Sequence, residues 1–129
     1  MPKVAPFSGY YNRPSHDEDT FLTDVSPDTP CGEYLRRYWH PFMLASELAE
    51  LPVPVRLLGE DLVVFRDGSG ELGLLHRHCI HRGTSLEFGI IADHGIRCCY
   101  HGWHFAVDGT ILDTPGEPPN VRIRDRHCQ

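Results

Sequence analysis

Two short Cys/His pairs contain the residues of this chain that are best suited to bind a metal. The first pair is Cys79 and His81, and the second is Cys98 and His101. A connection of sixteen residues, 82–97, separates the two pairs. Thiolate sulfur and imidazole nitrogen are donors that zinc and iron favour in proteins. Because each pair spans only two or three residues, it can bind from one tight loop. The four residues therefore predict a metal centre.

A set of two Cys and two His ligands suits two different centres. One is a tetrahedral zinc ion, and the other is a Rieske [2Fe–2S] cluster, in which two Cys bind one iron and two His bind the other. Zinc fingers usually group Cys with Cys and His with His, whereas each loop of this chain mixes one of each. A cluster requires mixed loops when both loops must reach both irons. We therefore favour the cluster and keep a structural zinc ion as the alternative.

The sequence around the two pairs resembles a known family. Cys-Ile-His-Arg-Gly at 79–83 and Tyr-His-Gly-Trp-His-Phe at 100–105 are similar to the motifs of Rieske non-haem iron oxygenases. These are the aromatic-ring-hydroxylating enzymes, and the phthalate dioxygenase branch is the nearest. The resemblance implies that the two cysteines of the pairs bind the inner iron and the two histidines bind the outer iron.

The same resemblance implies electron transfer within a larger oxygenase, either a dioxygenase or a monooxygenase. Electrons would come from a reductase or a ferredoxin and pass to a mononuclear Fe(II) site in a catalytic domain, which this chain lacks. Full-length members of the family are homo-oligomers, typically trimers. Segment 33–41 resembles the start of oxygenase α subunits. It favours this interpretation over the alternative, a stand-alone Rieske electron carrier without oxygenase activity.

Several other Cys and His residues lie close to the predicted ligands. Cys99 also forms a Cys-x-His pattern, but only Cys98 gives the three-residue step to the second histidine. We expect Cys99 to be a buried spare thiol, since free cysteine packs as a small apolar group. His76 and His78 flank a strand end and complete no ligand pair, and His104 lies on a predicted strand. These three histidines are expected to be surface or supporting residues.

The residues that flank the pairs suggest how the cluster is tuned. Trp103 and Phe105 are expected to lie in the core or to shield the cluster from water. The positive charge of Arg82 would raise the cluster potential, unless it forms an ion pair with Glu87 or another neighbour. Compared with respiratory Rieske proteins, these loops offer fewer hydrogen bonds to the cluster. The potential should therefore be low within the Rieske range of roughly −150 to +300 mV.

The composition excludes several classes of protein. The chain has 129 residues, 40% of them hydrophobic, and a formal net charge of −6, so a nucleic-acid partner is not expected. The acidity is a weak hint that a redox partner is basic. We expect neither a signal peptide nor a membrane span, because no apolar run is long enough. A reducing cytoplasm is therefore expected, where clustered Cys and His residues bind metal more often than they form disulfides. Cys31 and Cys128 would be plain thiols.

The residues before the first pair predict a helix and a three-stranded sheet. Thr29 can cap a helix that begins at Pro30 and runs to about Trp39. Runs of β-branched and apolar residues separated by turn signals then predict three strands, at 55–58, 62–66 and 72–75.

Short elements are expected around and after the second pair. A turn or half-helix is predicted at 85–89, a strand at 95–98, a hairpin at 104–112 and a strand at 121–125. Together the elements predict a mainly β fold, in which small antiparallel sheets position two cluster-binding loops and a short N-terminal helix precedes them.

The predicted organisation has three parts. They are an N-terminal extension at 1–28, a helix and connector at 29–50, and the Rieske [2Fe–2S] domain at 51–129, which we expect to be incomplete at its C-terminus.

Overall fold

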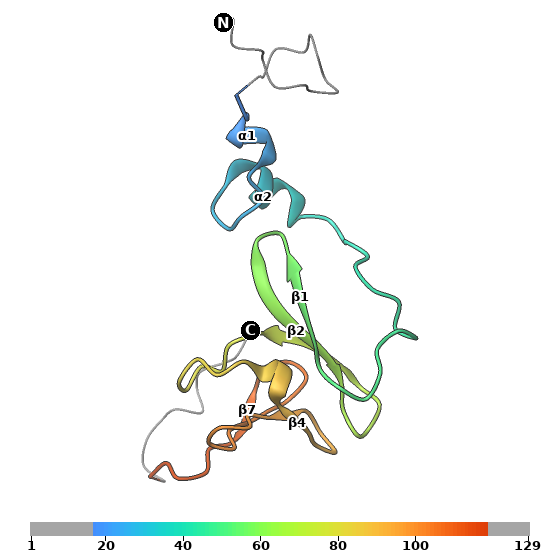
Figure 1. Cartoon of the computed structure of the whole chain (residues 1–129), viewed down its shortest axis with the longest axis vertical. Helices are drawn as coiled ribbons and strands as arrows, with labels where there is room; N and C mark the ends of the chain where they lie inside the picture. The colour runs from blue at the N-terminus through green and yellow to red at the C-terminus, as the bar shows by residue number, and fades with distance from the viewer. Residues whose placement is uncertain (1–16, 119–129) are drawn as a thin grey trace, which may run out of the picture.

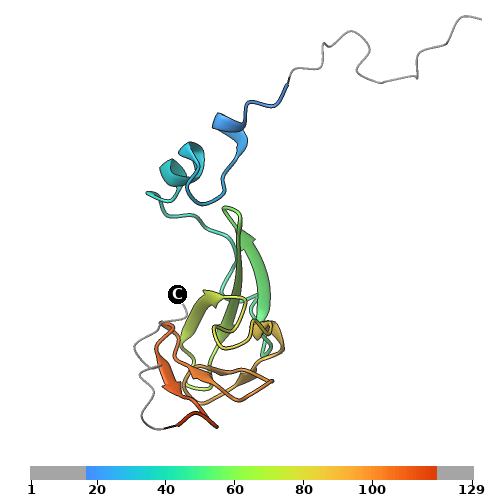
Figure 2. The same cartoon turned by 90° about the vertical axis from the view of Figure 1, so that its left-hand side faces the viewer.

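The computed structural model describes residues 17–118. Short helices lie at one end of an elongated molecule, a long hairpin occupies the middle, and a second small sheet forms the other end (Figures 1 and 2). The predicted strand at 121–125 lies outside the described residues. Within residues 17–118, no helix is long and apolar enough to cross a membrane. The prediction of a mainly β fold with small antiparallel sheets is confirmed.

Two short helices, α1 (Thr20–Thr23) and α2 (Pro30–Leu35), come first. The Thr29 side chain accepts a hydrogen bond from the Gly32 backbone N–H, and Pro30 occupies the first turn, as predicted. The helix does not reach Trp39. After Leu35 the chain continues as turns with hydrogen bonds between residues three apart. Tyr34, Tyr38 and Trp39 are exposed, so no buried apolar face holds a further helical turn in place.

The first sheet has the strand order β1-β2-β3 and is antiparallel throughout. Its strands are β1 (Val53–Leu57), β2 (Glu60–Arg66) and β3 (Leu72–His76). Val63 and Phe65, two residues apart on β2, are completely buried, and Leu75 pairs with Val63 from β3. Two-residue alternation thus places these side chains on the face that is packed against the rest of the domain.

The second sheet follows in the order β4-β5-β6-β7, again antiparallel. A 3-10 helix, η1 (Leu86–Phe88), precedes it, as the turn signal at 85–89 predicts. The strands are very short: β4 (Ile90–Ile91), β5 (Ile96–Arg97), β6 (His104–Phe105) and β7 (Ile111–Asp113). The hairpin predicted at 104–112 is therefore confirmed, with the ends of its strands differing by a residue or two.

The core lies between the two sheets and includes both predicted cysteine ligands. Its buried members are Val63, Phe65, Leu75, Cys79, Leu86, Ile96, Cys98, Trp103, Phe105 and Ile111. Since most of these side chains come from strand ends or the adjoining loops, the core itself fixes where each loop begins and ends.

A buried carboxylate joins the turns of the two sheets. Asp67 follows β2, and its Oδ1 accepts hydrogen bonds from the Ser69 N–H, the Ser69 hydroxyl and the Glu71 N–H. Its Oδ2 accepts the N–H of Gly95, at the start of β5, at 2.9 Å. One side chain thus satisfies donors from both sheets.

Candidate metal centre

The two Cys/His pairs lie on loops that have the same backbone hydrogen bonds. In the first loop, the Cys79 N–H donates to the Thr84 carbonyl, and the Gly83 N–H donates back to the Cys79 carbonyl, both at 2.8 Å. In the second, which joins β5 to β6, the Cys98 N–H donates to the Trp103 carbonyl at 2.8 Å. The Gly102 N–H donates to the Cys98 carbonyl at 3.0 Å.

A glycine in the left-handed conformation occupies the same place in each loop. Gly83 has φ 74° and Gly102 has φ 75°, and each is four residues after its cysteine. A residue with a Cβ is strained at such angles. Cys79 and Cys98 therefore begin two loops of matching geometry. The histidines occupy different places in them, because His81 is two residues after its cysteine and His101 is three.

The thiols face the core, and the imidazoles face outward. Cys79 is 2% exposed and Cys98 is 4% exposed, and both belong to the hydrophobic core. The His81 side chain is 19% exposed, and His101 is exposed. The two imidazole rings lie 4.6 Å apart between centroids, at an interplanar angle of 68°. The structure therefore brings the two predicted histidine ligands into direct contact and places both predicted cysteine ligands in the core.

Two neighbouring aromatic side chains belong to the core, and one of them adjoins His81. Trp103 is buried and stacks on His81, with ring centroids 4.6 Å apart and planes within 2° of parallel. Phe105 is completely buried next to it, at 6.5 Å between centroids. The predicted burial of both side chains is confirmed. The Nε1 atom of Trp103 is buried and has no hydrogen-bond partner among residues 17–118, which is unusual for a buried indole.

The structure corrects the expectation for Cys99. We predicted a buried thiol, but Cys99 is exposed, whereas its neighbour Cys98 is buried. The reason is the loop geometry: the hydrogen bonds at both ends of the second loop fix the Cys98 backbone, and the next residue then lies on the outer side. Burial thus separates two adjacent cysteines that the sequence left ambiguous.

The flanking histidines bind backbone carbonyls. Nδ1 of His78 lies 3.0 Å from the Gly83 carbonyl oxygen and so braces the first loop. Nε2 of His104 contacts the carbonyl oxygen of His94. These contacts suit the expected supporting role of the two residues.

The alternative considered for Arg82, an ion pair with Glu87, is not what the structure shows. Glu87 instead accepts a hydrogen bond from Arg77, at 2.8 Å, and Arg77 also reaches the Ser85 hydroxyl. Arg77 lies on the strand side of the first loop, where its side chain can reach the start of η1. Arg82 is exposed and forms no ion pair within the described part of the chain.

Sequence reasoning missed one residue at this site. Oε1 of Glu117 lies 3.4 Å from Nε2 of His81. The signal was the segment Pro115-Gly116-Glu117-Pro118, which reads as a stiff turn. Nothing in the spacing shows that this turn folds back to the first loop.

The donor set fits a [2Fe–2S] cluster of the Rieske type. Two buried sulfurs and two imidazoles that contact each other would supply two protein ligands for each of two irons, as such a cluster requires. Among residues 17–118, no group of three or more His, Cys, Asp or Glu side chains is placed to hold a metal ion. The unpartnered indole N–H beside His81 is also consistent with a bound group that would supply an acceptor.

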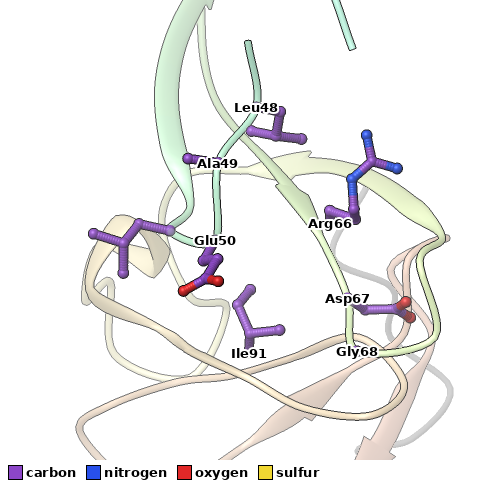
Figure 3. A pocket seen from close by; sticks show the side chains of 8 residues that line it. Leu48, Ala49, Glu50, Arg66, Asp67, Gly68 and Ile91 are labelled. Atoms are coloured by element: carbon purple, nitrogen blue, oxygen red, sulfur yellow. The ribbon is translucent and has the colours of Figure 1, made fainter. Parts of the chain in front are cut away.

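A groove of about 730 Å³ lies elsewhere in the molecule (Figure 3). The connector residues Leu48 and Glu50 line one side of it, Arg66 and Asp67 line the other, and Ile91 lies below. Its lining contains neither Cys nor His, so its residues offer no ligands for the predicted centre.

Known proteins resemble this chain over most of its length. The family model of the Rieske [2Fe-2S] domain matches residues 38–124. An oxygenase subunit of Aquincola tertiaricarbonis, described as tert-butanol monooxygenase / tert-amyl alcohol desaturase, is 58% identical over 105 residues, which are 81% of this chain and 22% of that protein. The phenoxybenzoate dioxygenase subunit alpha of Ectopseudomonas oleovorans is 56% identical over 111 residues, 86% of this chain and 27% of that protein. The chain thus spans about a quarter of the length of these relatives.

A solved structure with the same fold is the reduced complex between oxygenase and ferredoxin in carbazole 1,9a-dioxygenase. It matches with a TM-score of 0.61 and 32% sequence identity, over 71% of this chain and 24% of the other.

Proposed function

Because this chain belongs to the Rieske [2Fe–2S] domain family, we propose that Cys79, His81, Cys98 and His101 hold a Rieske cluster used for electron transfer. The observation that carries the proposal is the pair of matching loops, with both thiols in the core and the two imidazoles in contact with each other, His81 partly buried and His101 exposed. When bound, the cluster supplies the chemistry of accepting and releasing one electron.

The cysteine side and the histidine side of the site have different roles. The core around Cys79 and Cys98 keeps water away from the sulfur ligands, which favours a stable cluster. His101 is exposed, so the imidazole side lies at the protein surface, where a redox partner can approach. Trp103 limits the movement of the His81 ring by stacking on it. The site is thus buried on one side for stability and open on the other for exchange of electrons.

We further propose that the chain is the electron-transfer part of a larger oxygenase. Both relatives described above are oxygenase subunits that are much longer than this chain. In that setting the electrons go to a mononuclear Fe(II) site that two His and a carboxylate would form, and no residue of this chain is proposed for it.

The electron donor is proposed to be a ferredoxin or a reductase. The related oxygenase structure, which is a complex with a ferredoxin, supports this proposal. The charged residues near the site bear on which charges the donor surface should carry. Arg82 is exposed beside the first loop and forms no ion pair within residues 17–118, so it can pair with a carboxylate of the donor. The net charge of −6 and the carboxylate of Glu117 beside His81 favour positive charge elsewhere on the donor.

This docking is tested by stopped-flow reduction of Arg82→Gln with an acidic ferredoxin. The expected result is slower association at low salt and little difference at high salt. Equal association rates of the wild type and Arg82→Gln at low salt would show that Arg82 is not part of the docking surface.

The ligand assignment is tested with the adjacent cysteines as a matched pair. Cys98→Ser should lose the cluster, whereas Cys99→Ser should keep it, because only Cys98 faces the core with Cys79. Iron content and visible absorption of both purified variants decide the matter. Retention of a full cluster in Cys98→Ser, or its loss in Cys99→Ser, would show that the second sulfur ligand is misassigned.

Two coarser proposals concern the protein in the cell. A cytoplasmic location suits the free thiols of Cys31 and Cys99, and cell fractionation tests it. Assembly of the full-length protein into a trimer is implied by the family resemblance, and light scattering of that protein tests it.

A further inference from the structure

The strongest feature that the proposed function leaves unused is Glu117. Its Oε1 lies 3.4 Å from Nε2 of His81. The two residues are 36 positions apart, so the contact depends on the fold and not on local sequence. The Glu117 side chain is 26% exposed and that of His81 is 19% exposed. At such partly buried positions a charge acts more strongly on its neighbours than at an open surface.

A tight turn presents this carboxylate. The Glu117 N–H donates to the Thr114 carbonyl at 3.2 Å, and Gly116 has φ +82°. Proline at the second position and a glycine with positive φ at the third are the signature of a type II turn. Pro118 follows and further restricts the backbone of Glu117. The position of Glu117 is therefore set by the backbone.

The same turn rests on the second loop. A Cβ added at Gly102 would lie 3.6 Å from Cγ of Pro115, so the turn packs against the glycine that closes that loop. The turn thus touches both halves of the site, the second loop through Pro115 and the first loop through Glu117.

The contact distinguishes the two nitrogens of His81. Because the carboxylate faces Nε2, it favours the tautomer with its hydrogen on that atom and leaves Nδ1 as the lone-pair donor. Trp103 stacks on the flat face of the same ring, so the ring is held at its face and at one edge. His101 is different: it is exposed and contacts Tyr100 and His81.

Among the residues that the structure describes, no second ion-pair partner offsets the charge of Glu117. The nearby carboxylate of Asp113 pairs with Arg97, at 3.3 Å. Within residues 17–118, Glu117 has no ion-pair partner besides His81. A negative charge close to one histidine of the site disfavours the addition of an electron there.

We propose that Glu117 is a positioning residue for the cluster, which holds His81 with Nδ1 directed to iron and lowers the reduction potential through its charge. The inference rests on the proposed function, because it requires His81 to be a cluster ligand. The proposal also gives the two histidines different roles. The ring of His81 is held in place by Glu117 and Trp103, whereas His101 is exposed and accessible to a redox partner.

The test compares Glu117→Gln, Glu117→Asp and Glu71→Gln in the cluster-loaded full chain. Glu71→Gln is the matched control, because Glu71 is exposed in the β2–β3 turn, at the end of β3 that is remote from the first loop. Iron content is counted first, and the reduction potential is then measured by a dye-mediated titration at one pH. Glu117→Gln should raise the ratio of reduced to oxidised cluster at a fixed solution potential by about tenfold. For one electron this is a rise of about 59 mV. Glu117→Asp should shift it less, since the charge remains.

The outcomes separate this inference from the proposed function. A Glu117→Gln protein with two irons and a potential no higher than that of Glu71→Gln would overturn the role of Glu117 and leave the cluster assignment intact. A wild-type chain that binds no iron would overturn both.

If Glu117→Gln does not bind the cluster, the role of Glu117 is tested on the wild-type protein instead. Exchange of the two histidine ring N–H protons into deuterium oxide is followed by electron–nuclear double resonance. One proton should exchange several-fold more slowly than the other, because the carboxylate and Trp103 protect His81. Equal rates for the two protons would contradict the inference.

Discussion

Replacing the buried Asp67 with asparagine should destabilise the domain more than the same change at the exposed Asp93. Asp67 is 5% exposed, and its carboxylate accepts four hydrogen bonds, three from the turn after β2 and one from Gly95 of the second sheet. Asparagine keeps one oxygen but turns an NH₂ group toward one set of donors. A buried donor left without an acceptor costs about 1–3 kcal/mol, and the remaining bonds lose their charge assistance. The expected loss in the free energy of unfolding is about 2–4 kcal/mol.

The acid dependence of stability gives a second signature of Asp67. Burial alone would raise the pKa of this carboxyl, but the hydrogen bonds from Ser69, Gly95 and Glu71 outweigh it and hold the pKa below its usual range. Because the folded pKa is below the unfolded value of about 3.9, this contribution is complete above that pH. It is lost as the pH falls through the folded pKa. The asparagine variant should therefore lose less stability than the wild type on acidification.

Urea unfolding at pH 7 and at about pH 3 tests both signatures. Fluorescence is a suitable probe, since Trp39 is exposed and Trp103 is buried in the core. Asp93→Asn is the control, because Asp93 is exposed in the facing turn and its side chain forms no hydrogen bond described here. If Asp67→Asn unfolded within about 0.5 kcal/mol of Asp93→Asn at pH 7, Asp67 would not join the two sheets.

Two other substitutions test how the backbone and the helices are held. Gly95→Ala should lower the free energy of unfolding, measured in urea, by about 3 kcal/mol or more, because φ is +82° and the new Cβ would overlap the Phe105 carbonyl. Gly70→Ala, at φ +92° in open space, should lower it by only about 1–2 kcal/mol. Equal losses in the two variants would contradict the close approach of Gly95 to Phe105. Arg36→Ala should speed amide hydrogen exchange in α2, because Arg36 bonds to the Glu60 carboxylate and to carbonyls of the β1–β2 turn and of the segment before α2. Arg37→Ala, which changes an exposed neighbour, should leave exchange unaltered, and the same exchange in both variants would refute this tether.

Local sequence rules were sufficient for the strands and for the metal-binding pattern. Runs of β-branched and apolar residues between turn signals located all three strands of the first sheet. The Thr29 cap depends only on residues within one turn. The Cys/His spacing and its flanking motifs carried the family resemblance, which the match to the Rieske domain confirms.

Features that depend on distant parts of the chain were missed. The end of α2 was predicted too late, because its length depends on a packing partner for residues 37–39, which are exposed. The exposure of Cys99 follows from how the second loop closes. The contact between Glu117 and His81 joins a turn after the second sheet to a loop after the first. None of these is encoded in the spacing of neighbouring residues.

The most direct test of the central claim is a low-temperature electron paramagnetic resonance spectrum of the anaerobically purified, dithionite-reduced chain, with iron and zinc counted on the same sample. The account predicts a rhombic signal with the low average g value of a histidine-ligated cluster, and about two irons per chain. A colourless sample without a signal that holds one zinc ion per chain, or one that holds no metal, would contradict it.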